Sequence, residues 1–109
     1  MVQCYEVFAA LGDPTRQRMV DLLSQRERSV SELAGQFSIS LPGTLKHLRV
    51  LQDVGVVSRS KHGRIVTVRL EPEALVAAEE WLHDARTFWS HQLDNLADRF
   101  ADDVPKEDR

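Results

Sequence analysis

The chain has 109 residues, a net charge of −3 and one cysteine, Cys4. This length suffices for one domain with a modest hydrophobic core, and no apolar run is long enough to cross a bilayer. A lone cysteine excludes an internal disulfide, and the first residues lack the basic segment of a secretion signal, so we expect a cytoplasmic protein without a membrane anchor.

Two short helices are predicted at the N-terminal end. Residues 2–11 place apolar side chains, including Tyr5 and Phe8, on or near one helical face. A turn follows, in which Asp13 can cap a helix over residues 14–24 that begins with a proline. The buried side of this second helix is expected to contain Met19, Val20, Leu22 and Leu23.

A third short helix is predicted to follow a polar loop. Ser29 and Glu32 have the S-x-x-E spacing of a capping box, which starts a helix that continues to about Phe37. Val30 is expected to form a one-residue β-bridge just before this helix. The side chains expected in the core are Leu33, Ala34 and Phe37.

A fourth helix follows a tight turn over residues 38–40. Ser40 is the expected N-cap, Pro42 lies in the first turn, and Gly55 ends the helix in the usual position. Its predicted apolar side consists of Leu45, Leu48, Leu51 and Val54. Core packing is therefore the favoured role for Leu45.

Two alternating strands are predicted next, over residues 56–60 and 65–70, joined by residues 61–64 with Gly63 near the tip. The expected fold is mainly α with a small β-hairpin. A short helix, a tight connection, an amphipathic helix and a basic hairpin form a winged helix-turn-helix, which is a shape that contacts duplex DNA.

The C-terminal part is predicted to be one long helix over residues 72–100. A helix of this length extends on the order of 42 Å, more than a small winged domain can cover. Its apolar stripe therefore predicts a second copy of the chain as partner. We expect one DNA-binding and dimerisation domain over residues 1–101 and a disordered acidic tail over residues 102–109.

The charge is distributed unevenly along the chain. Residues 12–70 hold ten Arg or Lys and five Asp or Glu, a balance of +5, whereas the flanks carry −8. Binding to phosphates depends on the local field within about one Debye length, roughly 8–10 Å. A positive middle segment favours contact with DNA through one face, although a generally solvated charged surface is the alternative interpretation.

Four motifs together resemble the arsenical-resistance-repressor (ArsR) family of winged-helix regulators. They are FAALGDPTRQRMVDLL, SVSELAGQFSIS, the H-L-x-x-L-x-x-x-G-x-V run from His47 to Val57, and the wing SRSKHGRIVTVRL. The resemblance covers roughly residues 7–70. It implies a homodimer, built from the first and last helices, that represses transcription by binding an inverted repeat near its own promoter.

The DNA-binding residues are expected on the recognition helix and the wing. Arg49 can pair with guanine, Lys46 is better suited to a phosphate, and Arg64 at the wing tip can enter the minor groove. For Arg16 and Arg18, a phosphate contact and a plain surface role are equally open. The candidate set is Ser40, Leu41, Pro42, Thr44, Lys46, His47, Arg49, Arg59, Lys61, His62 and Arg64.

The candidate dimer interface combines the first and last helices. We expect its aromatic and aliphatic side chains to be left exposed by the chain's own domain. The set is Tyr5, Phe8, Trp81, Leu82, Phe88, Trp89, Leu93 and Leu96.

The sequence departs from the metal sensors that it resembles. The third helix contains no thiol pair, and His83 and His91 of the last helix belong to no D-x-H or H-x-x-E motif. We therefore expect no metal cofactor, with a metal-responsive repressor that uses His and carboxylate ligands of the last helix as the alternative. A further departure places Thr44 and Leu45 where the family usually has an aliphatic residue and then Ser.

No motif for catalysis is present, since the chain lacks a glycine-rich phosphate loop, a nucleophile elbow and a metal-hydrolase pattern. A DNA-binding regulator is the expected function, and a winged-helix module for protein interaction is the alternative from another class. Control is expected to come from autorepression or from an unidentified effector at the dimer interface.

Overall fold

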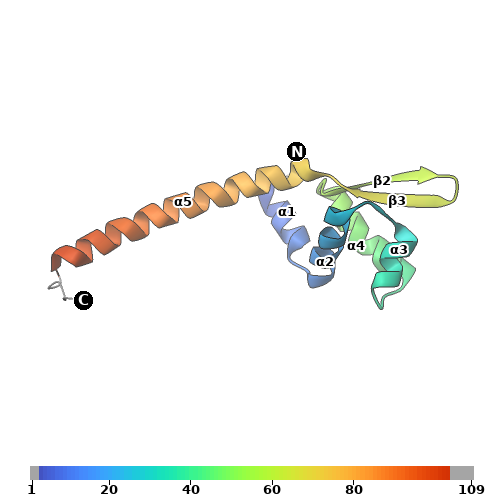
Figure 1. Ribbon diagram of the computed structural model, residues 1–109, viewed down its shortest axis with the longest axis horizontal. Helices are drawn as coiled ribbons and strands as arrows, with labels where there is room; N and C mark the ends of the chain where they lie inside the picture. The colour runs from blue at the N-terminus through green and yellow to red at the C-terminus, as the bar shows by residue number, and fades with distance from the viewer. Residues whose placement is uncertain (1–2, 104–109) are drawn as a thin grey trace. The chain divides into compact units, whose positions relative to one another are not determined.

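The computed structural model describes residues 3–103, with side chains through residue 101, and confirms a mainly helical winged fold (Figure 1). It divides into two units, one up to Ala78 and a helical one from Glu79 onward. In chain order the elements are α1 (Cys4–Leu11), α2 (Pro14–Gln25), β1 (Arg28–Ser29), α3 (Val30–Gln36), α4 (Leu41–Asp53), β2 (Val57–His62), β3 (Ile65–Leu70) and α5 (Pro72–Asp103).

The predicted helix starts of α2 and α4 are confirmed by their caps. An Asp13 carboxylate oxygen accepts the Arg16 backbone N–H at 3.0 Å, and Pro14 is the first residue of α2. The Ser40 hydroxyl oxygen accepts the Gly43 N–H at 3.1 Å. Each cap satisfies a backbone donor that the helix itself leaves unpaired.

The capping box of α3 is also confirmed. The Ser29 hydroxyl accepts the Glu32 N–H at 3.1 Å, and the Glu32 carboxylate accepts the Ser29 N–H at 3.3 Å. The β-bridge predicted at Val30 is wrong, because Val30 is the first residue of α3. The extended backbone of the cap instead lets Arg28 and Ser29 pair with β3 as the short strand β1.

The Glu32 carboxylate gives the stability of α3 a dependence on pH. The hydrogen bond from Arg26, with N and O 2.7 Å apart, and then the bond from the Ser29 N–H lower the pKa of Glu32 below its ordinary value of 4.5. A depressed pKa in the folded state stabilises the fold above the ordinary value, and this contribution is lost as the pH falls through the depressed value.

We therefore expect Glu32→Gln to lower the free energy of unfolding at pH 7, and the deficit to shrink as the pH falls below about 4.5. Urea unfolding of both proteins at several pH values measures this difference. Glu27→Gln, the same change at an exposed glutamate outside the capping box, is the control. A deficit that stays constant from pH 7 to pH 3 would contradict the assignment.

The sheet has three antiparallel strands in the order β1-β3-β2. The predicted range of β3 is confirmed, whereas β2 extends farther toward the tip than predicted, because Lys61 and His62, which were expected in the connection, pair with Val66 and Ile65. The turn is thus only Gly63 and Arg64, and Gly63 has the positive φ of 62° that a turn this tight requires. At the other end β2 begins at Val57 rather than at residue 56.

The core of the first unit lies where α4 packs against α1, α2, α3 and β2. Leu48 and Leu51 of α4 are fully buried as predicted, but the core placement of Leu45 is wrong, because its side chain is 36% exposed. Thr44 takes its place with no exposed surface. Residues 44, 48 and 51 are four and three apart, so they share one helical face. The other core residues are Val7, Ala10, Met19, Leu23, Val30, Leu33, Val56, Val57, Val68 and Ala78.

Helix α5 extends three residues beyond its predicted end, to Asp103. The predicted disordered tail is therefore wrong for residues 102 and 103, and the rest of that prediction lies outside the described residues. Within residues 3–103, no helix is both long and apolar enough to cross a membrane.

Candidate nucleic-acid interface

The outer side of α4 presents a mixed apolar and basic surface. Leu41 is half exposed, and Pro42, Lys46 and Arg49 are exposed. Lys46 and Arg49 are three residues apart and so lie on neighbouring positions of one helical face. The four residues were predicted as DNA contacts, and each has the exposure that such a contact requires.

Arg59 of β2 joins this surface from the wing. Its Nε donates to the Gln52 side-chain oxygen of α4 at 2.7 Å. Together with Leu45, the exposed residues Pro42, Lys46, Arg49 and Arg59 line a shallow hollow of about 440 Å³. This hydrogen bond to Gln52 therefore holds the wing arginine beside the two cations of α4.

Gln52 and Leu45 are the residues of this surface that the sequence did not identify. Leu45 was assigned to the core because it recurs at three-residue steps with Leu48, Leu51 and Val54. Gln52 lies three residues after Arg49 on the exposed side of α4, and this spacing was the available signal.

The tip of the wing is basic and exposed. Lys61, His62 and Arg64 are exposed. Within the described part of the chain, the ion pairs of the Lys and Arg side chains are Arg26–Glu32 and Arg69–Glu71, so none involves the cations of α4 or the wing tip. These charges are therefore available to phosphates, which supply most of the affinity of a protein for DNA.

His47 lies at the inner edge of α4 and connects it to the start of α2. An Arg16 guanidinium nitrogen lies 3.2 Å from His47 Nδ1, while the Asp13 carboxylate is farther away at 3.9 Å. Because the arginine side chain carries only donors, His47 Nδ1 is the acceptor in a hydrogen bond between the two groups. The His47 ring therefore connects α4 to Arg16 and Asp13 at the start of α2.

Asp13 and Arg16 both have structural roles here. The Arg16 backbone N–H bonded to Asp13 is the main reason that the pKa of this carboxyl lies below its ordinary value. Arg16 Nε also donates to the Ala10 carbonyl. Arg16 is therefore committed within the fold, whereas Arg18 is exposed.

Two of the predicted DNA contacts are engaged within the protein. Thr44 is completely buried and its hydroxyl donates to the Ser40 carbonyl at 3.1 Å, so its prediction as a base contact is wrong. Placing Thr44 on the core face of α4 keeps its hydroxyl away from solvent. The Ser40 hydroxyl accepts the capping hydrogen bond from the Gly43 N–H, although Ser40 itself is exposed.

Comparisons with known proteins agree with this geometry. A family model described as a helix-turn-helix domain matches residues 11–59. The transcriptional repressor SdpR of Bacillus subtilis is 32% identical over 70% of this chain and 84% of its own length. The HTH-type transcriptional regulator Rv2034 of Mycobacterium tuberculosis is 32% identical over 81% of this chain and 79% of its own length.

A crystal structure of an ArsR family transcriptional regulator is 38% identical, with a TM-score of 0.74 over 79% of this chain and 94% of the other. The chain belongs to the ArsR family. It is accordingly a DNA-binding transcriptional regulator, and its winged helix-turn-helix is the part that meets double-stranded DNA. The relatives that it matches are named as transcriptional regulators or repressors.

The second unit of this ArsR-family protein exposes a continuous apolar stripe. Leu82, Trp89 and Leu96 are seven residues apart, and Leu93 and Phe100 fall between and after them at steps of three and four. All five are between 47% and 63% exposed. This 3-4 spacing is the pattern of a seam that packs against another helix.

The remaining residues predicted for the interface differ in their surroundings. Trp81 and Phe88 are more than half exposed, and the Phe88 ring meets Trp89 edge to face with centroids 5.8 Å apart. In the first unit Tyr5 is 69% exposed, whereas Phe8 is partly buried against the core.

Metal ligands do not converge in the described part of the chain, where no group of three or more His, Cys, Asp or Glu is placed to hold an ion. His83 and His91 are exposed on α5, eight residues apart. Cys4 is partly buried, with its sulfur 3.7 Å from the Ala77 carbonyl.

Proposed function

We propose that this protein is a homodimeric repressor that binds an inverted-repeat operator without a metal cofactor. The observation that carries the proposal is the basic surface on which Lys46 and Arg49 of α4 lie beside Arg59 of the wing. These side chains have no acidic partner among residues 3–101, so their charge is open to DNA.

In the proposed complex, α4 enters the major groove by its N-terminal turns. Leu41 and Pro42 provide apolar contact, for which a thymine methyl group is the fitting partner. Arg49 carries a guanidinium that matches guanine, and Lys46 serves a phosphate. His47 lies at the edge of this surface, beside Arg16 of α2.

The wing is proposed to contact the adjacent minor groove. Arg64 is one of the two residues of the turn, so it is the cation nearest the tip of the hairpin. A narrow minor groove concentrates negative potential and attracts such an arginine. Lys61 and His62 are placed near the tip to contact the flanking phosphates.

Two copies of this surface fit an inverted repeat. The apolar stripe of α5 and the exposed Tyr5 of α1 favour a homodimer, since exposed apolar side chains in this number are costly in water. In such a dimer the recognition helices meet successive major grooves about 34–36 Å apart. The relative SdpR is named a transcriptional repressor, which supports repression as the outcome of DNA binding.

Selection from a random duplex library, followed by footprinting, tests the proposal. We expect an enriched inverted repeat, protection of both half-sites, and affinity that falls steeply with salt. Enrichment of a single half-site would contradict the dimeric docking. Equal binding to all duplexes, or none at low salt, would contradict the proposed function and favour a module for protein interaction.

Zinc, nickel and cobalt are expected to leave folding and operator binding unchanged at stoichiometric amounts. A tight site usually needs three or four donors in fixed geometry. His83 and His91 lie about 12 Å apart along the helix axis, too far to share one ion within a chain. Calorimetry with each metal, before and after chelation, measures this. A tight site that His91→Ala removes, coupled to release of DNA, would establish a metal sensor instead.

A further inference from the structure

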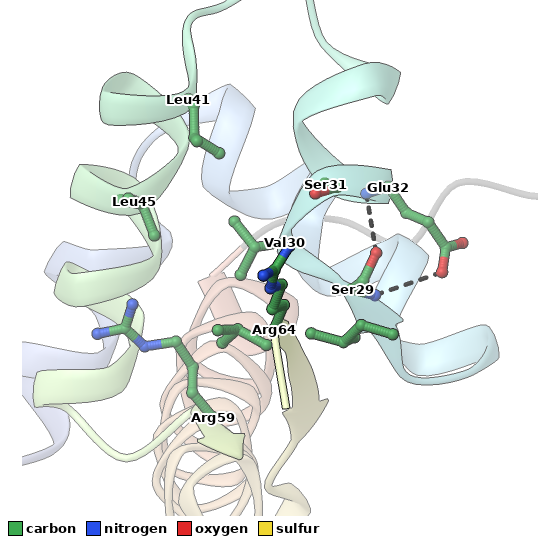
Figure 2. A pocket seen from close by; sticks show the side chains of 10 residues that line it. Ser29, Val30, Ser31, Glu32, Leu41, Leu45, Arg59 and Arg64 are labelled. Atoms are coloured by element: carbon green, nitrogen blue, oxygen red, sulfur yellow. Dashed lines mark hydrogen bonds between the residues drawn. The ribbon is translucent and has the colours of Figure 1, made fainter. Parts of the chain in front are cut away.

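A cavity of about 510 Å³ lies between α3, α4 and the wing of the first unit (Figure 2). This volume falls within the range of sites for small organic ligands. Figure 2 shows Leu41 and Leu45 of α4 on one side and Ser31 and Glu32 of α3 on the other. The lining residues are Ser29, Val30, Ser31, Glu32, Leu41, Leu45, Arg59, Arg64, Ile65 and Val66.

Half of the residues that line this cavity are aliphatic. Five of its ten lining residues are Val, Leu or Ile, and two of them, Leu41 and Ile65, are 50% and 60% exposed. Contact with phosphates does not require such side chains, because phosphates are bound by cations and hydrogen-bond donors. A ligand with an apolar body would remove these aliphatic side chains from water, which favours its binding.

The polar groups of the cavity favour a negative charge on that ligand. Arg64 extends into the space between α3 and α4 and has no ion-pair partner in the described part of the chain (Figure 2). The one carboxylate of the lining, Glu32, is already paired with Arg26 at 2.7 Å. An arginine beside an aliphatic wall matches an organic carboxylate, whose two oxygens can accept a bidentate hydrogen bond.

We infer that this cavity is an effector site for an organic carboxylate with an apolar body, and that its occupation opposes DNA binding. The inference rests on the proposed function, because Arg64 and Leu41 would serve both partners. A carboxylate on Arg64 removes the wing charge that a phosphate would bind. All of the residues that line this site belong to the winged unit.

Calorimetry on the full chain without DNA tests the site itself. Octanoate and naphthoate are the probes for an aliphatic and an aromatic acid, and octanamide is the neutral control. We expect one acid site per protomer, no octanamide binding, and a loss of about tenfold or more in affinity in Arg64→Gln. Arg18→Gln, which removes an exposed arginine outside the cavity, is expected to bind like the wild type.

Two variants change the cavity without removing a proposed DNA contact. Ile65→Asn makes one wall polar, and Ser31→Trp fills the space from α3. Both positions are exposed, so the core is retained, and circular dichroism checks this. Each variant is expected to lose acid binding and to keep its affinity for the operator.

Fluorescence anisotropy with the selected operator then tests the regulation. Saturating acid is expected to weaken DNA binding by about 5- to 150-fold, and saturating DNA to weaken acid binding by the same factor. Ile65→Asn and Ser31→Trp should resist this displacement. Acid binding that leaves DNA affinity unchanged would overturn the regulatory role.

The failures of the two proposals are distinguishable. Specific DNA binding without any binding of octanoate or naphthoate at millimolar concentration would overturn the site and leave the repressor intact. Acid binding that survives both Ile65→Asn and Ser31→Trp would also overturn the site. Acid binding that depends on these residues, in a protein that binds no specific DNA, would support the site and overturn its role in repression.

Discussion

Arg49→Ala is expected to weaken operator binding by about 1–3 kcal/mol per half-site and to relax the preference for the base that it contacts. The reason is that an exposed guanidinium on the recognition helix can read a base edge, whereas a phosphate contact cannot discriminate sequence. Competition binding against a panel of single-base operator variants measures both effects. A uniform loss across the panel would show that Arg49 contacts the backbone instead.

Arg64→Ala provides the contrasting result. It is expected to weaken binding to all duplexes alike and to reduce the slope of log affinity against log salt by about one per protomer. Arg69→Ala removes an arginine of the same hairpin that already pairs with Glu71 at 3.1 Å, so it should change neither quantity greatly. Wild-type binding by both Arg49→Ala and Arg64→Ala would contradict the docking of α4 and the wing.

The helix starts on the DNA-facing unit were predictable because short-range chemistry determines them. The caps at Asp13, Ser29 and Ser40 each join residues three apart, and all three hydrogen bonds are present. A pattern within four residues is fully visible in the sequence. The order of helices and hairpin, and hence the fold class, followed from these starts.

The sequence indicated less clearly which face of α4 is turned toward the core. Leu45 and Thr44 are neighbours, and only the packing of α4 on the rest of the core decides which one faces inward. A leucine seemed the better core residue, but the fold buries the threonine and satisfies its hydroxyl within the helix at the Ser40 carbonyl. The exposed Leu45 then becomes part of the basic hollow rather than the core.

Contacts between elements were the features that the sequence did not reveal. The bond between Gln52 and Arg59 joins a helix to a strand, and no periodicity within either element indicates it. The cavity beside Arg64 likewise depends on how α3, α4 and the wing are assembled. Most of the predicted DNA-binding residues are exposed, whereas the residues that position them were visible only in the structure.

Breaking the apolar seam of α5 is expected to have the largest effect on function. Trp89→Glu combined with Leu93→Glu places two charges on the stripe, where each side chain buried by a partner would contribute on the order of 1.5–3 kcal/mol. We expect a monomer at micromolar concentration. Because two linked half-sites bind more tightly than one, affinity for the inverted repeat should fall on the order of 10²- to 10⁴-fold.

The same variant should retain its winged unit. The core of that unit lies within residues 7–78, so the two substitutions at residues 89 and 93 do not touch it. Binding to a single half-site should therefore stay near the wild-type value measured for one half-site. Sedimentation equilibrium gives the oligomeric state, and titrations with one and two half-sites separate the loss of linkage from a loss of folding.

Thr87→Glu combined with Ser90→Glu is the matched control, since it adds the same charge to α5 away from the stripe and from Trp81 and Phe88. This control should remain a dimer and bind the inverted repeat like the wild type. If both double variants dissociate, charge on α5 rather than the apolar seam controls assembly. If neither does, the dimer is held by other residues, and the exposed Tyr5 on α1 becomes the first position to change.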